Sequence, residues 1–389
     1  MKIADRMTRL RGETAFEVLV RARALEAQGR EIVHLEIGEP DFATPEHITA
    51  AAMAALQRGE THYSPSAGIP ALREAIAEEV SRSRGIPVSP SQVVVTPGGK
   101  PIIFYSLLAL AEPGDEVIYP DPGFPTYASM ISFAGARPVP IALREANGFR
   151  LDVAELKSLI TPRTRLLIIN SPHNPTGGVL LPEDLAAIAE LALEHDLAVL
   201  SDEIYSRIYY EGEHRSIASF PGLQERTVIL DGFSKSYAMT GWRLGYGVMP
   251  RLLAAHVTLL MTNSNSCTAS FTQWAGVEAL HGPQTACDQM VTAFRERRDV
   301  LVAGLRQIPG LRCTLPQGAF YAFPNIQGTG LSSKAFADYV LEEAGVATLS
   351  GASFGAHGEG YIRLSYANTV DHLRLALDRI GAAVARLNR

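Results

Sequence analysis

Seven short apolar segments recur between about residue 93 and residue 250, and they constrain the fold more than any other feature of this sequence. Several are apolar throughout, which is typical of strands buried on both faces of a sheet. Helical segments separate many of them, such as Glu183–Glu194, whose Leu185, Ile188 and Ala192 share one face. This alternation predicts an α/β fold with a mostly parallel seven-stranded sheet. The expected strands are Val93–Thr96, Glu116–Pro120, Arg137–Leu143, Arg165–Asn170, Leu197–Asp202, Thr227–Gly232 and Gly245–Met249.

A different pattern begins at about Thr285, where helices and strand-like segments follow one another without a further apolar series. The chain has 389 residues, which is too long for one ordinary domain. We therefore expect a large domain at 46–284 and a smaller α+β domain formed by 1–45 and 285–389. The expected elements of the smaller domain are helices near Phe16–Gln28, Phe294–Gln307 and Ser333–Ala344, strands in Gly318–Phe323 and Tyr361–Ala367, and a final helix.

The charge pattern argues against nucleic acid or a membrane as a main partner. Lys and Arg number 35 and Asp and Glu number 41, so the net charge is −6, and no basic stripe is present. The first 13 residues lack the apolar core of a signal peptide, and apolar runs such as Leu166–Ile169 are too short to span a bilayer. Cys267, Cys287 and Cys313 are odd in number, far apart and without metal-site spacing, which suits a reducing compartment. We expect a cytoplasmic protein without a metal site.

Polar residues cluster where the expected strands end. In a doubly wound sheet, ligands bind at the carboxyl ends of the strands. The sequence places several groups there, so their convergence is more informative than any single motif. These groups are Gly98-Gly99-Lys100, Asn174, Asp202 with Tyr205, and Ser234-Lys235.

Lys235 is the candidate nucleophile. It follows an expected strand, and a lysine in such a place can form a Schiff base if its surroundings lower its pKa. Ser234 adjoins it and Arg243 lies eight residues further on, so a hydroxyl and a guanidinium could bind a phosphate near the amine. The alternative is a surface lysine in a polar loop.

Asp202 and Asn174 each have a functional and an ordinary interpretation. A carboxylate at the end of a buried strand needs a cationic partner, which a protonated pyridine nitrogen would supply. An aspartate there can equally be a helix N-cap. Asn174 lies in Asn170–Gly178 (NSPHNPTGG), where its amide could bind a phenolic oxygen, but Asn-Pro followed by Thr-Gly is also a common turn sequence.

Two further groups could bind anions. Gly98 and Gly99 precede an expected helix at Ile102–Ala111, and small residues at a helix N-terminus expose backbone N–H groups. Arg363 alternates with apolar neighbours in a strand-like segment, so it is either a surface residue or a bidentate receptor for a carboxylate.

Taken together, these segments resemble the class I aminotransferases of pyridoxal-phosphate (PLP) fold type I, and among them the prokaryotic aspartate aminotransferase subgroup. The resemblance covers nearly the whole chain and keeps the family's order of motifs. The matching segments are Ile37–Phe42, Thr61–Arg73, Thr96–Lys100, Asn170–Gly178, Ser201–Tyr205, Phe233–Tyr246, Gly318–Tyr321 and Ile362–Ala367.

The resemblance implies PLP as cofactor and gives each of these residues a role. Lys235 matches the Schiff-base lysine that also moves the proton. Asp202 matches the partner of the pyridine nitrogen, while Tyr205 and Asn174 match the residues at the phenolic oxygen. Phe124 matches the aromatic residue that stacks on the cofactor ring.

The same resemblance assigns phosphate and substrate contacts. Gly99, Lys100, Ser234 and Arg243 match the phosphate region, and Tyr63 matches a tyrosine that reaches the phosphate from the other subunit of a homodimer. Arg363 matches the receptor for the substrate α-carboxylate, helped by Gly38 and Asn174, and Lys100 could also reach a distal substrate carboxylate.

Three positions depart from the family pattern. Gly232 stands where many relatives carry a serine, and Phe124 stands where tryptophan or tyrosine is frequent. Ala15 stands where dicarboxylate-preferring relatives carry a threonine, and Thr14 is one residue away. The last departure weighs against strict specificity for aspartate.

The expected reaction is ping-pong transfer of an amino group between an amino acid and a 2-oxo acid, with aspartate or glutamate/2-oxoglutarate as the expected dicarboxylic partner. Alternatives on the same fold are an aminotransferase for neutral or aromatic amino acids, a C–S β-lyase, and a decarboxylase or synthase. A PLP-sensing transcription regulator would need an N-terminal DNA-binding domain, for which the sequence before Gly38 has no room.

Overall fold

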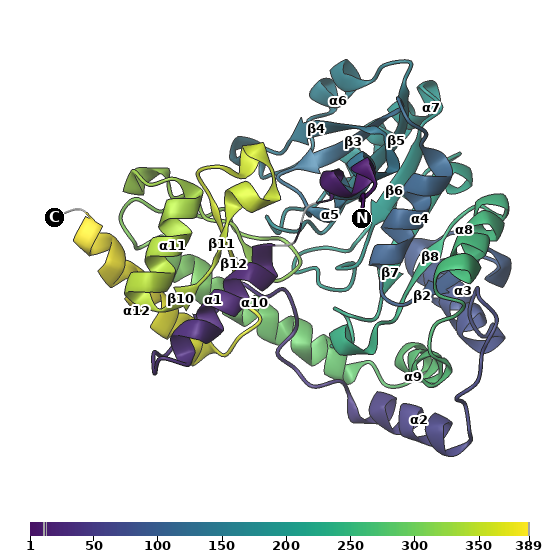
Figure 1. The fold of residues 1–389 in the computed structure, drawn as a ribbon, viewed down its shortest axis with the longest axis horizontal. Helices are drawn as coiled ribbons and strands as arrows, with labels where there is room; N and C mark the ends of the chain where they lie inside the picture. The colour runs from purple at the N-terminus through teal and green to yellow at the C-terminus, as the bar shows by residue number, and fades with distance from the viewer. Residues whose placement is uncertain (11, 13, 388–389) are drawn as a thin grey trace.

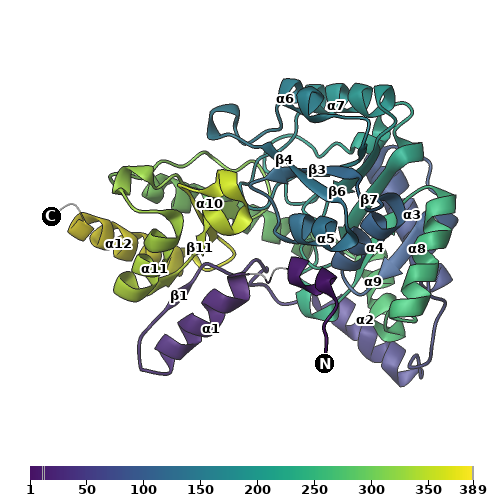
Figure 2. The same cartoon turned by 45° about the horizontal axis from the view of Figure 1, so that its top comes forward.

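The computed structural model describes residues 1–10, 12 and 14–387. Two bodies of secondary structure lie side by side in it (Figure 1), and α10 runs from one toward the other. The larger body contains a seven-stranded sheet, and the smaller contains α1 and the C-terminal elements. Turning the molecule shows the same division, with α1, α11 and α12 on one side and the sheet on the other (Figure 2).

The large sheet has the strand order β2-β8-β7-β6-β5-β3-β4. The neighbours β7–β6, β6–β5, β5–β3 and β3–β4 are parallel, and β8 runs antiparallel to both of its neighbours. The prediction of an α/β fold with a mostly parallel seven-stranded sheet is therefore confirmed. The strands are β2 Val93–Thr96, β3 Glu116–Asp121, β4 Arg137–Ala142, β5 Thr164–Asn170, β6 Ala198–Asp202, β7 Thr227–Gly232 and β8 Gly245–Val248.

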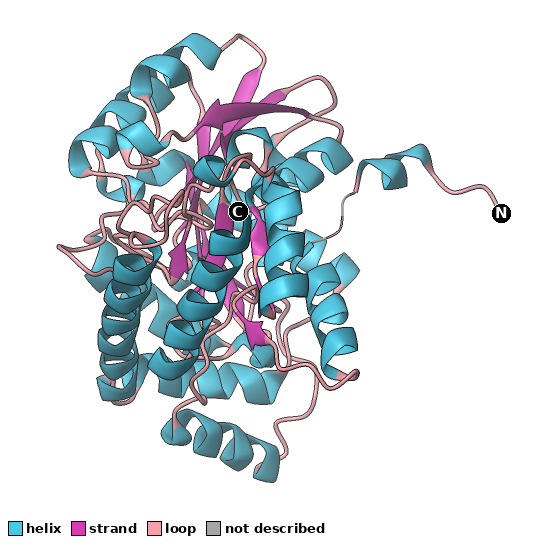
Figure 3. Ribbon diagram, turned by 90° about the vertical axis from the view of Figure 1, so that its left-hand side faces the viewer, coloured by secondary structure: helices cyan, strands magenta, loops and turns pink. Residues whose placement is uncertain are grey.

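Helices cover both faces of this sheet (Figure 3), so strands such as β2, β5 and β7 are almost entirely buried. Alternate residues pack against different layers: Leu166 and Ile168 of β5 pack with α4, α5 and α8, and Leu167 and Ile169 pack with α6 and α7. The helices of the larger body are α2 Glu46–Gln57, α3 Pro70–Arg84, α4 Lys100–Leu110, α5 Thr126–Ala134, α6 Val153–Leu159, α7 Pro182–Glu194, α8 Arg251–Ser264 and α9 Ser270–His281.

The smaller body has its own core, in which α10, α11 and α12 pack on short strands. Tyr205, Ile208 and Tyr210, which follow β6, also belong to this core, so the two bodies share packing. The division into 46–284 and 1–45 with 285–389 stays a prediction. The elements are α1 Thr14–Glu26, β1 Val33–His34, α10 Thr285–Leu305, β9 Tyr321–Ala322, α11 Ser333–Ala344, β10 Val346–Ala347, β11 Leu349–Ser350, β12 Ile362–Ser365 and α12 Val370–Leu387.

Some expected elements in this body have different bounds. The strand expected at Gly318–Phe323 is reduced to β9, because Ala319 has a positive φ of 56° and Gly318 instead bridges to Tyr209. The helix expected from Phe294 begins at Thr285. Within the described residues, no helix is long and apolar enough to cross a membrane.

Candidate active site

One cavity of about 980 Å³ lies at the carboxyl ends of β5, β6 and β7 and is bounded on its other sides by α1, the segment after β1, and β12. Its position follows from the topology, since the ends of parallel strands meet at one edge of the sheet. It brings together nearly all of the site residues expected from the sequence. Those lining it are Gly38, Gly99, Lys100, Phe124, Asn174, Asp202, Tyr205, Ser234, Lys235, Arg243 and Arg363.

Tyr63 is the exception. Its side chain is 90% exposed and does not line the cavity of its own chain. The expectation that it acts on the site of a second subunit stays a prediction.

Lys235 extends from the segment that follows β7 into the cavity. Its Nζ donates to the carbonyl oxygen of Gly38 at 2.5 Å, so it links the sheet edge to the segment after β1. The pKa of Lys235 is lowered to about 8, mainly by burial; the negative charge of Glu39 opposes this shift, and the positive charges of Arg363, Arg243 and Lys100 contribute to it. A substantial fraction of this amine is therefore neutral near physiological pH, as a nucleophile or a base requires.

Asp202 ends β6 and is buried. Its Oδ2 accepts from the Tyr127 hydroxyl at 2.6 Å and its Oδ1 accepts from the Ile204 N–H at 3.2 Å. Among the residues that the structure describes, none forms an ion pair with this carboxylate, and burial raises its pKa to about 6. A protonated ring nitrogen in the cavity would provide the missing cation.

Arg363 on β12 is held rigidly at the opposite wall. Its Nη1 donates to Asn174 Oδ1 at 3.2 Å, its Nη2 donates to the Glu36 carbonyl oxygen, and its guanidinium lies 4.5 Å from the centroid of the Tyr321 ring. The hydroxyl oxygens of Tyr321 and Tyr205 lie 2.8 Å apart and share a hydrogen bond. These contacts fix a planar cation beside an amide, an arrangement suited to binding a carboxylate.

A narrow cradle lies between the loop before α4 and the segment after β7. A Cβ at Gly245 would lie 2.6 Å from backbone atoms of Gly98 and Gly99, and a Cβ at Gly98 would lie 2.2 Å from Arg243 Nη2. Only glycine permits this approach, which places the Arg243 guanidinium beside the N-terminus of α4. With Ser234 on the same cavity wall, the cradle offers N–H, hydroxyl and guanidinium donors to a phosphate.

The residues present therefore fit PLP. The cavity offers an amine of lowered pKa, a buried carboxylate without a cationic partner in the described chain, and a cradle for a phosphate. Phe124 lines the cavity and meets Tyr127 edge to face, with the ring centroids 5.7 Å apart. The ammonium of Lys100 lies 5.4 Å from the centroid of the Phe124 ring.

Two tyrosines of the site were not among the predicted residues. Tyr127 bonds Asp202, and Tyr321 contacts Tyr205 and Arg363. Tyr127 lies three residues after Phe124, and Tyr321 ends the matching segment Gly318–Tyr321. This proximity is the signal that the sequence offers, because nothing in its pattern tells which aromatic residue of a loop faces a cavity.

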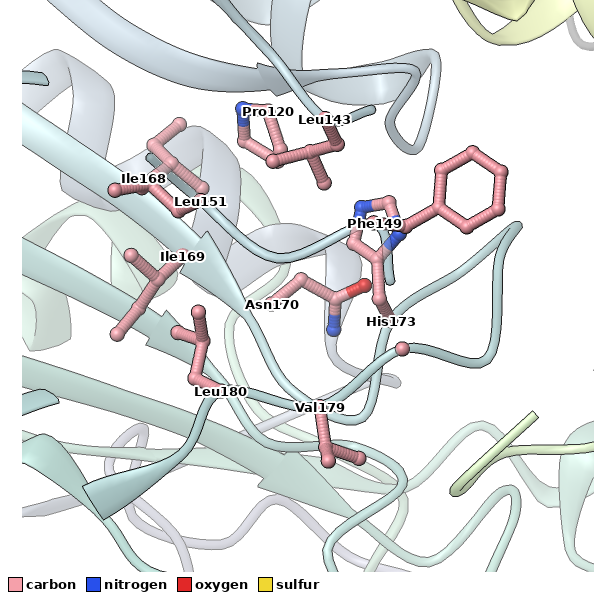
Figure 4. Close-up of a pocket in the computed structure, with 11 residues that line it drawn as sticks. Pro120, Leu143, Phe149, Leu151, Ile168, Ile169, Asn170, His173, Val179 and Leu180 are labelled. Carbon is pink, nitrogen blue, oxygen red and sulfur yellow. The ribbon is translucent and has the colours of Figure 1, made fainter. Parts of the chain in front are cut away.

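A second cavity lies beside the end of β5 and is lined in part by the loop that follows it (Figure 4). It measures about 20 Å³, enough for a single water molecule, and leucine, isoleucine and valine side chains form most of its wall. His173 is buried there and burial lowers its pKa to about 3, so its imidazole is neutral. This cavity is too small for an amino acid.

Comparison with known proteins agrees with this geometry. Residues 30–380 match the family model described as "Aminotransferase class I and II". The chain is 44% identical to an aromatic-amino-acid aminotransferase of Thermococcus litoralis (91% of this chain, 92% of the other) and 41% identical to an aspartate aminotransferase of Geobacillus stearothermophilus (98% of each). The solved structure of the Thermus thermophilus aspartate aminotransferase with maleate superposes with a TM-score of 0.95 at 39% identity, over 98% of this chain and all of that one. The chain therefore belongs to the class I and II aminotransferases and is a PLP-dependent transaminase of fold type I.

Proposed function

We propose that the 980 Å³ cavity is the transamination site, with Lys235 as its catalytic residue and a dicarboxylic acid as one of its substrates. The observation that carries the proposal is the meeting of three features in one cavity: an amine of lowered pKa, a buried carboxylate and a rigidly held arginine. When bound, PLP supplies an electron sink for the electrons released when a substrate Cα–H bond breaks.

Lys235 would hold PLP through its side-chain amine until an amino-acid substrate enters. Its free amine would then accept the proton from the substrate Cα as a general base and donate it again later in the transfer. Its pKa of about 8 suits both directions, since neither the neutral nor the protonated form is rare near pH 7–8. A second 2-oxo acid reverses the sequence, so the kinetics are ping-pong.

Asp202 would pair with the protonated ring nitrogen of PLP, and Tyr127 holds this carboxylate in place. Gly99, Ser234, Arg243 and the first turn of α4 would hold the phosphate. Phe124 would pack against the ring, and Tyr205 with Asn174 would bind the phenolic oxygen.

Arg363 binds the α-carboxylate of the substrate, with Asn174 and the backbone at Gly38 completing the site. The guanidinium is already oriented by Asn174 and Tyr321, so little rotamer freedom is lost on binding. A carboxylate fixed here directs the Cα toward Lys235 on the facing wall.

The side chain of the substrate lies toward Lys100 and α1. Lys100 can meet a distal carboxylate as a point charge, which favours aspartate or glutamate. Phe16, Ile37 and Phe124 add apolar surface and Ala15 supplies no hydroxyl, which leaves room for a neutral or aromatic side chain. Relatives named for aspartate and for aromatic amino acids both resemble this chain, which supports a mixed preference.

Half-transamination tests the reaction class. Purified enzyme loaded with PLP is mixed with an amino acid and no 2-oxo acid, and pyridoxamine phosphate and 2-oxo acid are measured. We expect one equivalent of each per site. Pyruvate and ammonia from a cysteine S-conjugate without pyridoxamine phosphate would instead identify a β-lyase.

A panel of amino donors tests the proposal that Lys100 binds the distal carboxylate of the substrate. Wild type and Lys100→Ala are compared by kcat/KM on aspartate, glutamate, alanine and phenylalanine. A partly solvated charge pair should discriminate by about 1–3 kcal/mol, so we expect a selective loss on the two dicarboxylates. An equal loss on all four donors, or no loss, would move the substrate assignment to a neutral amino acid.

A further inference from the structure

A buried ionic cluster lies directly behind the candidate active site. Arg84, the last residue of α3, donates from Nε to Glu203 Oε2 at 2.9 Å and from Nη2 to Asp231 Oδ2 at 2.5 Å. His214 Nε2 lies 3.1 Å from Glu203 Oε2, and the Ser206 hydroxyl donates to Asp231 Oδ2 at 3.1 Å. Arg84, Glu203 and Asp231 are each less than 9% exposed.

The cluster and the active site occupy opposite faces of the same two strand ends. Side chains alternate along a strand, so Asp202 and Leu230 face the cavity and Glu203 and Asp231 face α3. Asp202 pairs with Leu230 in the register of β6 and β7, and the Glu203 N–H donates to the Leu230 carbonyl oxygen at 2.8 Å. The cluster therefore joins β6 to β7 one residue beyond Asp202 and four residues before Lys235.

We propose that Arg84 is a positioning residue for catalysis, whose forked guanidinium clamps the ends of β6 and β7 and thereby fixes Lys235 relative to Asp202. The inference rests on the proposed roles of these two residues. Glu203 is the residue after Asp202, and Asp231 lies on the strand that leads to Lys235, so each carboxylate of the clamp is close in sequence to one of the two catalytic-site residues. Asp231 Oδ1 also accepts from the Gly232 N–H at 2.7 Å, which fixes the start of the segment that leads to Lys235.

The hydrogen bonds of the cluster indicate that it aligns the two strand ends and does not merely stabilise the fold. A buried ion pair is weak evidence for stability, because well-packed apolar residues of similar volume stabilise as well or better. Here every carboxylate oxygen has a donor: Glu203 Oε1 accepts from Ser201 and Ser216, and Oε2 from Arg84 and His214. Such a fully bonded network specifies one geometry.

The charged groups of the cluster also affect the pKa of Asp202. His214 and Arg84 outweigh burial and lower the pKa of Glu203 to about 2, so this carboxylate stays ionised. The negative charges of Asp231 and Glu203 add to burial in raising the pKa of Asp202. Removal of the Arg84 charge would leave Asp231 without its cationic partner and Glu203 with His214 alone, both behind Asp202.

Arg84→Lys tests the clamp, because lysine keeps the charge but cannot bridge two carboxylates in a planar fork. We expect kcat to fall about 10- to 100-fold with KM for the amino donor changed less than about threefold, the signature of a misplaced catalytic group. In the cofactor-free protein, reductive methylation of Lys235 is followed against pH by mass spectrometry. Its midpoint should rise from about 8 toward the ordinary 10.5 as the loosened segment becomes solvated.

Arg298→Lys is the matched control. Arg298 on α10 is equally buried and pairs with Glu211 and Asp299, but it contacts neither strand end. It should lower the thermal unfolding midpoint and leave kcat and the methylation midpoint unchanged. Ser206→Ala, which removes one hydrogen bond to Asp231, should move both quantities in the same direction as Arg84→Lys by a smaller amount.

The proposal would be overturned if Arg84→Lys and Ser206→Ala had the same kcat and the same methylation midpoint as Arg298→Lys. If Arg84→Lys does not fold, Ser206→Ala decides the question alone. Failure of the proposed function would be distinguishable, since wild-type protein would then show no half-transamination while the methylation midpoint could still be compared between variants.

Discussion

Lys235 and Asp202 are both ionisable groups whose burial opposes the charge they would carry in water. Burial lowers the pKa of Lys235 to about 8 and raises the pKa of Asp202 to about 6. The two shifts have opposite chemical uses. The amine gains a reactive neutral form, and the carboxylate becomes a strong acceptor for any cation that enters the cavity.

The lowered pKa of Lys235 predicts how cofactor capture depends on pH. Attachment requires the neutral amine, so the rate of capture of PLP by cofactor-free protein should rise steeply up to about pH 8 and level off above it. Stopped-flow absorbance measures this rate, and borohydride followed by peptide mapping should locate the cofactor on Lys235. A rate that still rises at pH 10, or cofactor on another lysine, would contradict the assignment.

Asp202→Asn should separate stability from function. The rise in pKa from 3.8 to about 6 means that the ionised carboxylate destabilises the cofactor-free fold by about 3 kcal/mol at most. This cost is fully present above pH 6 and absent below pH 3.8, because below that value both folded and unfolded states are protonated. The amide keeps the shape and can still bond Ile204 and Tyr127.

We therefore expect cofactor-free Asp202→Asn to have a higher unfolding midpoint than wild type at pH 8 and an equal one near pH 3.8, while turnover with PLP is almost lost. Calorimetry across this range measures the first part and a coupled assay the second. Near-normal turnover would refute the role of Asp202, and a lower midpoint at pH 8 would refute the stability argument.

At the scale of elements, α1 forms one wall of the cavity and is tied to β1 by a histidine. His34 Nδ1 lies 2.8 Å from Glu36 Oε1 and its Nε2 lies 3.1 Å from Glu26 Oε1 at the end of α1. The hydrogen bond to Glu36 is the main cause of a pKa of about 9 for His34, with Glu26 adding to it against burial. The imidazolium thus joins the helix to the strand near neutral pH.

This tie predicts a loss of stability at alkaline pH. The folded state holds the His34 proton up to about pH 9, whereas the unfolded state releases it near 6.5, so the stabilisation is complete below pH 6.5 and is lost as pH rises through 9. Between these values the unfolding midpoint of wild type should fall more steeply than that of His34→Gln. His372→Gln is the control, because His372 on α12 bonds the amide of Asn368 and not a carboxylate. Parallel curves for wild type and His34→Gln would refute the tie.

The seven strands of the large sheet could be predicted because several are continuous apolar runs, typical of strands buried on both faces, and helical segments separate many of them. β2 and β7 even have the expected bounds. The short β9 could not be predicted, since its length depends on the left-handed φ at Ala319, which no side-chain pattern encodes. The start of α10 differs from the expectation: the helix begins at Thr285, and Cys287, Met290 and Phe294 lie buried at helical spacing in its first turns.

Residues of the candidate site could be predicted where a polar or charged residue type lies at or just after the end of an expected strand. Lys235, Asp202 and Asn174 are of this kind, and they line one cavity with Arg363 from the other body. Tyr127 was not predictable, because its hydroxyl reaches Asp202 across 75 positions of sequence and only the packing of α5 on the sheet brings them together. The Arg84 cluster was missed because its members are charged residues scattered over three elements.

At the scale of the whole molecule, the cavity lies where the two bodies meet, with Lys235 on one and Arg363 on the other. We propose that residues 46–284 form one domain and residues 1–45 and 285–389 the other, so that a change in the angle between them would alter the distance between the Lys235 amine and the Arg363 guanidinium.

We also propose a cytoplasmic homodimer. Large apolar side chains of the sheet-bearing body are exposed in the single chain, which suits coverage by a second copy; they include Met53, Leu56, Tyr63, Leu252 and Leu259.

The proposed homodimer makes Tyr63 a test of a shared active site. Tyr63 is far more exposed than a tyrosine that serves its own chain would be, and in a twofold dimer each copy would reach the phosphate of the other. Lys235→Ala should be inactive, and Tyr63→Ala should bind PLP weakly. Equal amounts of the two variants, mixed under conditions that allow subunit exchange, form heterodimers in which one of the two sites has both residues intact. We expect activity to recover to about a quarter of the wild-type value, because half of the dimers are mixed and each of those has one intact site. The same mixture held under conditions that prevent exchange is the control and should show only the sum of the parents. No recovery after exchange, or a monomer in analytical ultracentrifugation at assay concentration, would show that each chain works alone and that Tyr63 has no part in the site.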